Sequence, residues 1–182
     1  TRGVPGTHNL KLLNQTIRNL KNNKFPLFLP VFDKVTDNKK KYQRKVNKVD
    51  LIILEGWFVG SKPIDPNYLK KNINDLEKIE DSNLLWRNAY NKALVEYQKV
   101  FKKFSYFVFI KIPNWKFVID WKYKQELGLR SSNSNNHLKK KLYRFIQFYE
   151  KLSKWMFLTS PSDCNVLVTL DKKQTAKKIT YK

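Results

Sequence analysis

Val49-Asp50-Leu51-Ile52-Ile53-Leu54-Glu55-Gly56-Trp57 is the stretch from which we predict the fold class. Its apolar run is too short to cross a membrane and carries one charge, so the pattern is typical of a strand buried on both faces of a parallel sheet. Ligands of open parallel α/β sheets bind beyond the carboxyl ends of the strands. Glu55 is therefore a candidate site residue, and the alternative is a solvated glutamate before a turn glycine.

The rest of the sequence alternates helix-like and strand-like segments. Apolar spacing predicts helices over 10–21, 84–103, 115–130 and 137–155, a short helix within 67–78, and strands over 105–112 and 165–170. Two prolines restrict 25–32 to an edge strand or an extended loop. The polar span 35–48 is expected to be an exposed excursion, and the end of the chain from Asp171 a basic tail. This alternation predicts an α/β fold with a mostly parallel sheet, in a single domain over 1–182.

The charge of the chain is strongly positive. It has 37 Lys and Arg against 15 Asp and Glu, a formal net charge of +22. Such a field favours anionic partners, either nucleic acid or small molecules that carry phosphate. Lys and Asn are nevertheless spread along the whole sequence, as in Lys39-Lys40-Lys41, and no nucleic-acid motif accompanies them. We therefore favour a biased genome composition as the cause, and do not expect nucleic acid as the main partner.

Several classes of protein are disfavoured by simple features. No segment approaches the roughly 20 apolar residues of a membrane span, and Thr1–Gly6 has no apolar signal core, so we expect a cytoplasmic protein with no membrane partner. The single cysteine, Cys164, excludes an internal disulfide and a zinc cluster. A start without Met on a Gly- and Pro-rich loop suggests a fragment or a processed chain. The sequence makes no prediction of oligomeric state.

The opening stretch Arg2-Gly3-Val4-Pro5-Gly6-Thr7-His8-Asn9 is a loop by its Gly and Pro content. Asn9 is suited to cap the helix that follows. The loop brings Arg2, Thr7 and His8 to a helix N-terminus, where backbone N–H groups favour an anion. The alternative for His8 is an ordinary residue of the capping region.

Four stretches together resemble the D-glycerate 3-kinase family, P-loop kinases related to the pantothenate, uridine and phosphoribulose kinases. They are Arg2–Asn9, similar to a family loop R-G-x-x-G-[ST]-H-D; Pro30–Lys34, an apolar-proline stretch that ends in Asp-Lys; Leu54–Gly60, similar to L-E-G-W-x-x-G; and Trp121–Arg130, similar to W-R-x-x-x-E-x-x-x-R. They occur in the order of the family and extend over most of the chain. The resemblance therefore implies a P-loop NTPase-like three-layer α/β fold.

The resemblance also implies ATP-dependent phosphoryl transfer to a small hydroxy acid, most readily D-glycerate. It implies that Glu55 orients Mg²⁺ beside the phosphates of ATP, and that Arg2 and His8 line the acceptor pocket as catalytic residues. The further residues that it assigns are Gly6, Thr7, Asp33 and Lys34 for the substrate and Lys124 and Arg130 for a lid over the phosphates.

Three departures from the family pattern matter. No G-x-x-x-x-G-K-[ST] cradle occurs in the sequence. In the family, this cradle and the catalytic base precede the loop, so we expect 1–182 to be the C-terminal part of such a kinase and inactive alone. His8-Asn9 replaces His-Asp, and Ser134-Asn135-Asn136-His137 replaces an acidic start of the lid helix. The alternative is an inactive kinase-fold remnant or a basic module that binds RNA or another polyanion.

Overall fold

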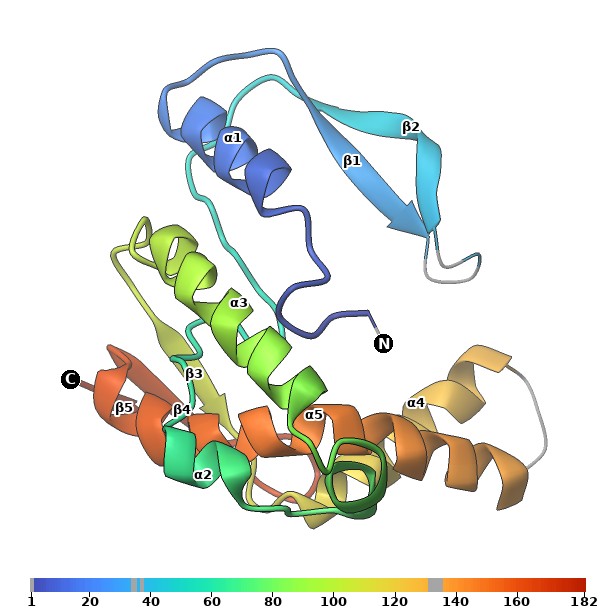
Figure 1. Cartoon of the computed structure of the whole chain (residues 1–182). Helices are drawn as coiled ribbons and strands as arrows, with labels where there is room; N and C mark the ends of the chain where they lie inside the picture. The colour runs from blue at the N-terminus through green and yellow to red at the C-terminus, as the bar shows by residue number, and fades with distance from the viewer. Residues whose placement is uncertain (1, 34–35, 37, 131–135) are drawn as a thin grey trace. The chain divides into compact units, whose positions relative to one another are not determined.

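The structure is a computed structural model, and it describes residues 2–33, 36, 38–130 and 136–182 (Figure 1). The chain forms two compact units. Unit 1 comprises Thr1–His8 and Trp57–Lys182, and unit 2 comprises Asn9–Gly56. Each unit is described by itself below, and the expected single domain stays a prediction.

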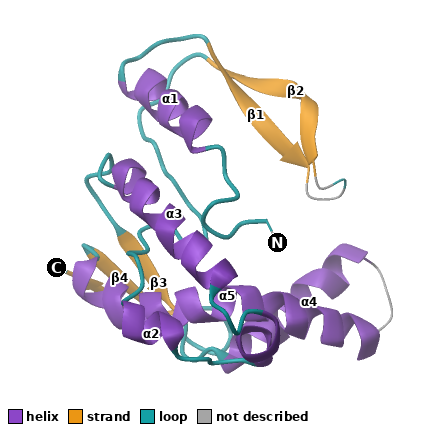
Figure 2. Cartoon of the chain, in the orientation of Figure 1, coloured by secondary structure: helices purple, strands orange, loops and turns teal. Residues whose placement is uncertain are grey.

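Unit 2 is a helix followed by a two-stranded ribbon (Figure 2). Its elements are α1 (Leu10–Lys21), β1 (Leu27–Asp33) and β2 (Asn38–Val46). The predicted helix over 10–21 is confirmed, and Asn9 caps it, because the Asn9 side chain accepts a hydrogen bond from the Leu12 N–H at 2.9 Å. Ile17 and Leu20 are its buried residues.

The ribbon corrects the prediction of an irregular excursion over 35–48. β2 pairs antiparallel with β1, from Leu27 opposite Val46 to Asp33 opposite Asn38. Sequence patterning missed β2 because nearly all of its side chains are exposed, so it shows no alternation of apolar and polar residues. Its regular structure comes from backbone hydrogen bonds to β1, which any side chain permits.

The predicted buried strand over 49–54 is wrong for the described structure. The segment belongs to none of the strands found among the described residues, and Leu51 and Ile53 are 74% and 77% exposed. A strand requires a neighbour that satisfies its backbone N–H and C=O groups. The apolar run predicts burial, but no strand in the described part of the chain pairs with it.

Unit 1 holds the remaining elements. They are α2 (Pro66–Lys70), the π-helical turn η1 (Leu76–Glu80), α3 (Leu85–Phe101), β3 (Val108–Lys111), α4 (Lys116–Arg130), α5 (Asn136–Asp163), β4 (Val166–Leu170) and β5 (Ala176–Tyr181). The predicted long helices and the strands at β3 and β4 are confirmed. α5 continues past the predicted end at 155, and β5 replaces part of the predicted basic tail.

The sheet of unit 1 is small and only partly parallel. Its order is β3–β4–β5, with β3 and β4 parallel and β4 and β5 antiparallel. The class is therefore mixed α/β, as predicted, but the mostly parallel sheet is not present among the described strands. β5 was missed because nearly all of its side chains are exposed and two of them are lysines, so no apolar run marks it.

The two faces of this sheet differ. Phe109 points into the core, where Phe157 of α5 lies 6.4 Å from it between ring centroids. On the other face Val108, Ile110 and Ile179 are at least half exposed. Parallel strand pairs are normally covered on both faces, so this apolar face is a surface that lacks such a cover among the described residues.

α5 is the central helix of unit 1 and crosses behind α3 in Figure 1. Its buried residues Tyr149, Leu152 and Met156 contribute to one hydrophobic cluster. The rest of that cluster comprises Val4, Phe58, Ile64, Leu69, Tyr90, Leu94, Phe109 and Cys164. Residues from the first loop, the 57–69 segment, two helices and the sheet thus share one core. Among the described residues, no helix is long and apolar enough to span a bilayer.

Arg87 is a fully buried charge at the centre of a second, polar cluster. Its guanidinium donates to the Asp81 carboxylate at 2.8 Å and to the Asn72 side chain at 2.8 Å, and also to the Leu69 carbonyl at 3.1 Å. Asp81 in turn accepts from the N–H of Trp86 at the start of α3. Because an unpaired buried charge is very costly, these bonds fix the segment between α2 and α3.

Lys151 of α5 extends the polar cluster through Glu77. Its ammonium lies 3.2 Å from the Glu77 carboxylate and donates to the Tyr68 carbonyl at 3.1 Å. Burial raises the pKa of Glu77 despite the nearby cations, and burial lowers the pKa of Lys151 despite Glu77. The pair therefore joins α5 to η1, and its desolvation cost is offset by mutual pairing together with backbone hydrogen bonds, such as the one from the Ile73 N–H to Glu77 at 3.0 Å.

Replacing Arg87 is expected to destabilise the protein strongly. Arg87→Met leaves the buried Asp81 carboxylate without the guanidinium that pairs with it at 2.8 Å, and breaking a buried pair in this way costs about 3–5 kcal/mol. Urea unfolding followed by circular dichroism measures the loss. Lys99→Met is the matched control, because Lys99 pairs with Glu96 on an exposed helix surface, where such pairs are worth about 1 kcal/mol or less. Equal losses in the two variants would contradict the prediction.

Candidate functional site

The loop Arg2–His8 is closed on itself by Thr7. The Thr7 hydroxyl donates to the Val4 carbonyl at 2.8 Å and accepts from the Gly3 N–H at 2.9 Å. Gly3 and Gly6 both have positive φ, of 85° and 96°, which glycine adopts at little cost. Val4 is buried in the core of unit 1 and anchors the turn. The residues that the family resemblance assigns to a site thus form an ordered turn.

Tyr97 of α3 holds one side of this loop. Its hydroxyl accepts a hydrogen bond from the Gly6 N–H at 3.1 Å and lies 2.7 Å from His8 Nδ1. The hydroxyl donates to His8 Nδ1 when the neutral imidazole carries its proton on Nε2, and accepts from it when the proton is on Nδ1. Burial beside Tyr97 lowers the pKa of His8, which favours this neutral form.

Tyr149 of α5 holds the other side of the loop and joins it to a second motif. Its hydroxyl donates to the Arg2 carbonyl at 2.6 Å. The Trp57 ring stacks on its ring at 4.6 Å with an interplanar angle of 21°, and the Trp57 indole N–H donates to Ser153 at 2.8 Å. Burial raises the pKa of Tyr149 to about 12, against the opposing effect of Arg2. One side chain therefore orders two stretches that are far apart in sequence, at Arg2 and at Trp57.

Gly60, the last residue of the L-E-G-W-x-x-G-like stretch, has a packing role. Its φ is 84°, and a Cβ there would lie 2.5 Å from the Phe107 ring. Any other residue would clash with Phe107 in an unfavourable backbone conformation. This glycine lets the chain after Trp57 lie directly against the segment that leads into β3.

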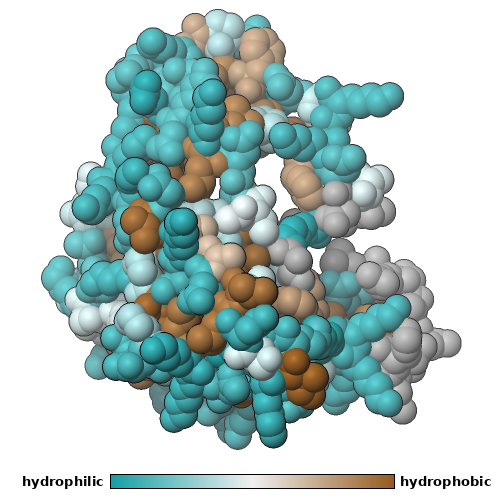
Figure 3. All heavy atoms as spheres, viewed as in Figure 1, coloured by the Kyte–Doolittle hydropathy of each residue, from teal (hydrophilic) through white to brown (hydrophobic). Residues whose placement is uncertain are grey.

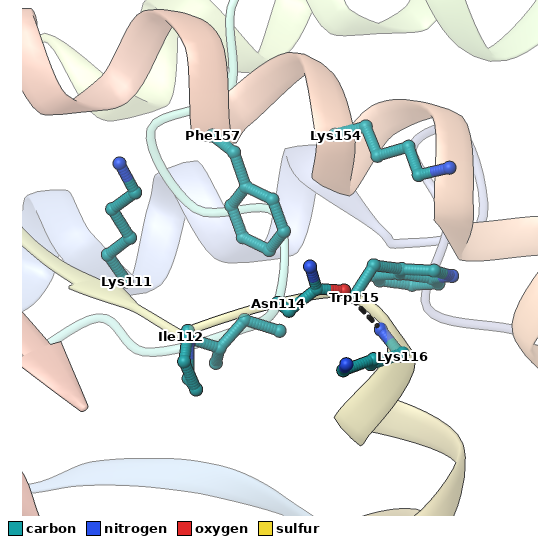
Figure 4. A pocket seen from close by; sticks show the side chains of 8 residues that line it. Lys111, Ile112, Asn114, Trp115, Lys116, Lys154 and Phe157 are labelled. Atoms are coloured by element: carbon teal, nitrogen blue, oxygen red, sulfur yellow. Dashed lines mark hydrogen bonds between the residues drawn. The ribbon is translucent and has the colours of Figure 1, made fainter. Parts of the chain in front are cut away.

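A hollow of about 520 Å³ lies at the carboxyl end of β3. It is lined by Lys111, Ile112, Pro113, Asn114, Trp115, Lys116, Lys154 and Phe157. Figure 4 shows Phe157 pointing from α5 toward the loop at Ile112, and Lys154 extending above Trp115. Asn114 accepts from the Lys116 N–H at 3.0 Å and starts α4. The centroid of the Trp115 ring lies 6.4 Å from that of Trp57, so the hollow adjoins the stretch that resembles L-E-G-W-x-x-G. Three lysines line it, and although Lys154 pairs with Glu150 at 2.7 Å, the positive charge of Lys111 and Lys116 suits an anion.

A second hollow, of about 410 Å³, contains Lys124, which the resemblance assigns to the phosphate lid. Its lining residues are Trp121, Lys124 and Gln125 of α4 and Lys172, Lys173 and Gln174 of the turn before β5. The Trp121 indole N–H donates to the Lys172 carbonyl at 3.3 Å and connects the two walls. Like the first hollow, this one is lined by lysines and a tryptophan ring, here Trp121, and its lining contains no carboxylate.

The other predicted site residues are placed as follows. Glu55 is exposed and belongs to unit 2, at the end of the segment that forms no strand among the described residues. Asp33 ends β1, opposite Asn38, in the same unit. Lys34 and the side chain of Arg130 lie outside the described part of the chain. The structure brings Arg2, Gly6, Thr7 and His8 together in unit 1, and their combination with Glu55, Asp33 and the lid stays a prediction.

The side chains available to bind a metal ion are His, Cys, Asp and Glu. Among the described residues, no group of three or more His, Cys, Asp and Glu side chains gathers as it would in an all-protein metal site. Mg²⁺ in phosphoryl-transfer sites is instead held by one or two carboxylates together with phosphates and water. The single exposed carboxylate of Glu55 fits that mode of binding.

Sequence patterning missed the residues that order the site. Tyr97 and Tyr149 lie within predicted helices, and a helical period cannot show that a hydroxyl meets a distant backbone. Lys111, Lys116 and Lys154 could not be singled out from the sequence, because lysines occur along the whole chain. A signal did exist for Asn114, because asparagine before a helical segment is a common cap.

The fold and the sequence were compared with known proteins. Over 98–100% of its length the chain matches a D-glycerate 3-kinase from Cryptococcus neoformans var. grubii, with a TM-score of 0.75 and 20% identity, and the YGR205w protein, with a TM-score of 0.68 and 22% identity. It covers 69% and 66% of those chains. The predicted resemblance to this class of kinase is thus confirmed for the fold, which is a mixed α/β fold shared with a kinase structure.

Curated proteins with similar sequences are also kinases by name. The chain is 26% identical over 159 residues to "Uncharacterized kinase mug58" of Schizosaccharomyces pombe and 28% identical over 165 residues to "Probable ATP-dependent kinase TDA10" of Saccharomyces cerevisiae. Each match covers 81% of this chain but only 56% and 53% of the relative, so the chain spans about half the length of these proteins. No family model matches the chain.

His8 is expected to titrate below the ordinary histidine pKa of 6.5. Its burial disfavours the imidazolium, so the folded protein binds a proton less readily than the unfolded chain, and stability falls as the pH decreases below 6.5. The chain has two histidines. NMR titration of the ring protons, with His137→Gln to assign them, measures the midpoint. A midpoint at or above 6.5 for His8 would disprove the buried neutral form.

Proposed function

We propose that the protein is an ATP-dependent kinase that transfers a phosphoryl group to a small hydroxy acid, with D-glycerate as the acceptor. In this proposal 1–182 is the C-terminal part of a three-layer P-loop kinase. The observation that carries it is the convergence of the Arg2–His8 loop and Trp57 on Tyr149. Two separate motifs of the family resemblance are thereby ordered by one side chain, in a fold shared with a D-glycerate 3-kinase.

The acceptor is assigned to the loop Arg2–His8. A hydroxy acid presents a carboxylate and a hydroxyl, which Arg2 and the neutral imidazole of His8 are chemically suited to bind. Gly6 leaves room for the backbone to approach a ligand, and Thr7 keeps the turn in shape through Val4 and Gly3. Asp33 and Lys34 are assigned to the same substrate by resemblance.

The phosphates of ATP are assigned to the lysine-lined hollows of unit 1. Phosphoryl transfer depends on neutralising charge and positioning the reactants more than on covalent chemistry. Lys124, with Lys172 across the hollow, supplies positive charge from α4 and the turn before β5. Arg130, at the end of the same helix, is assigned to the lid with Lys124.

Glu55 is assigned to Mg²⁺. It precedes Trp57 by two residues in the stretch that resembles L-E-G-W-x-x-G, and the assignment rests on that resemblance. Bound Mg²⁺ would neutralise charge on the phosphates of ATP.

The first test is turnover. The complete polypeptide, with ATP, Mg²⁺ and D-glycerate, is expected to release ADP and form phosphoglycerate, measured by a coupled ADP assay and by phosphorus NMR. A version restricted to 1–182 is expected to show no turnover, because its sequence contains no G-x-x-x-x-G-K-[ST] cradle. Absence of turnover with glycerate and related hydroxy acids would contradict the proposal.

Tyr149→Phe is expected to weaken acceptor use without unfolding the protein. The ring still stacks on Trp57, but the hydrogen bond to the Arg2 carbonyl is lost, and the loop is held less firmly. A neutral hydrogen bond is worth about 0.5–1.5 kcal/mol, so kcat/KM for the acceptor should fall about two- to tenfold. Tyr143→Phe is the matched control, because Tyr143 lies on the same helix and is mostly exposed. An equal effect of both variants on kcat/KM would contradict a role of Tyr149 in holding the acceptor loop.

A further inference from the structure

The ribbon of unit 2 carries a face that combines rings with positive charge. In the register of β1 and β2, Phe28 lies opposite Lys45 and Phe32 lies opposite Lys39. Paired residues point to the same side of a sheet. Lys41 lies between Lys39 and Gln43 in the irregular stretch of β2 and is included by its place in the row. The register shifts by two residues between Pro30 and Phe32, and the alternating exposure along β1 keeps Phe28 and Phe32 on one side. We call this set of five residues the lysine–phenylalanine face.

The lysine–phenylalanine face is accessible. Phe28 and Phe32 are 53% and 48% exposed, and Lys39, Lys41 and Lys45 are exposed as well. Pro30 and Gln43 complete the face, which carries no acidic residue. Figure 3 shows hydrophilic side chains projecting over the ribbon beside hydrophobic ones. Large exposed aromatic residues with lysines between them are unusual on a surface that only contacts water.

We propose that the lysine–phenylalanine face binds single-stranded nucleic acid. Proteins that bind single strands combine lysines or arginines along the backbone with aromatic rings on which bases stack. Phe28 and Phe32 are four residues apart on one strand, about 13 Å, and Lys39 to Lys45 extends over about 20 Å of the other. That row of charge is longer than a single nucleotide, so it fits a polymer of phosphates.

Other partners fit this face less well. The bases of a duplex are already stacked on one another, so Phe28 and Phe32 would find no exposed base surface. An anionic membrane would attract the lysines, but Gln43 lies among them, and its amide would lose its hydrogen bonds in an apolar layer. In contrast, a base edge offers donors and acceptors to the same amide.

The structure adds the register of β1 and β2, which the sequence alone does not give. The charge run alone was explained by composition, because no aromatic motif accompanied it. β1 supplies the aromatic residues and β2 the cations, and only their antiparallel register places them side by side. The inference is independent of the proposed phosphoryl transfer, since none of these five residues is assigned to ATP or to the acceptor.

The test measures fluorescence anisotropy of labelled 12-nucleotide single strands, rU12 and dT12, titrated with the complete polypeptide over a series of salt concentrations. Each phosphate contact on a single strand contributes about 0.7 to the slope of log affinity against log salt. K39Q/K45Q should therefore lower that slope by about 1.4. F28A/F32A should weaken binding at least fivefold while the slope stays unchanged, because stacking is not ionic. F28L/F32L, which keeps the apolar bulk, should weaken it as well.

K40Q/R44Q is the matched control, because it removes the same charge from the opposite side of the same strand. It should change affinity less than K39Q/K45Q. Comparing rU12 with dT12 identifies RNA or DNA as the preferred strand. The proposal is overturned if neither strand binds, if K40Q/R44Q has the larger effect, if F28A/F32A and F28L/F32L leave affinity unchanged, or if the protein binds phosphatidylcholine–phosphatidylserine vesicles but not the oligonucleotides.

Discussion

The burial of charge beside α5 is the constraint on which unit 1 depends. Arg87 has no exposed surface, so each of its donors must be satisfied inside the protein. The bonds to Asp81 and Asn72 and to carbonyls near α2 fix the course of the chain between α2 and α3. Through Glu77, Lys151 connects α5 to the same cluster. An apolar core alone tolerates sliding of helices, whereas these directional bonds specify one arrangement.

The candidate site uses the same helix on another side. Two residues before Lys151, Tyr149 meets the Arg2 carbonyl and the Trp57 ring. Because successive helical residues point in different directions, one stretch of α5 contacts both the polar cluster and the first loop. The loop residues assigned to the acceptor are held by the hydrogen bonds of Tyr97 and Tyr149 and by the buried side chain of Val4.

The large positive charge has different consequences in the two units. In unit 1, lysines gather around Trp115 and Trp121 in hollows, an arrangement suited to a compact phosphate-bearing ligand. In unit 2 they form an open row along β2 beside Phe28 and Phe32, an arrangement suited to an extended one. Net charge alone predicts attraction to anions in general. The shape of the surface around the lysines determines whether a compact or an extended anion fits.

The sequence by itself determined the helices, the strands β3 and β4, the cap at Asn9 and the resemblance to a class of kinases. These features depend on local periodicity, on single residues or on the order of motifs, all of which are written along the chain. Sequence reasoning failed at 49–54, where an apolar run has no strand partner in the described structure, and at β2, where exposed residues form a strand. Only the tertiary structure decided that Tyr149 joins Arg2 to Trp57 and that phenylalanines of β1 face lysines of β2. Such pairings connect residues far apart in sequence, and no local pattern encodes which distant group a hydroxyl or a strand will meet.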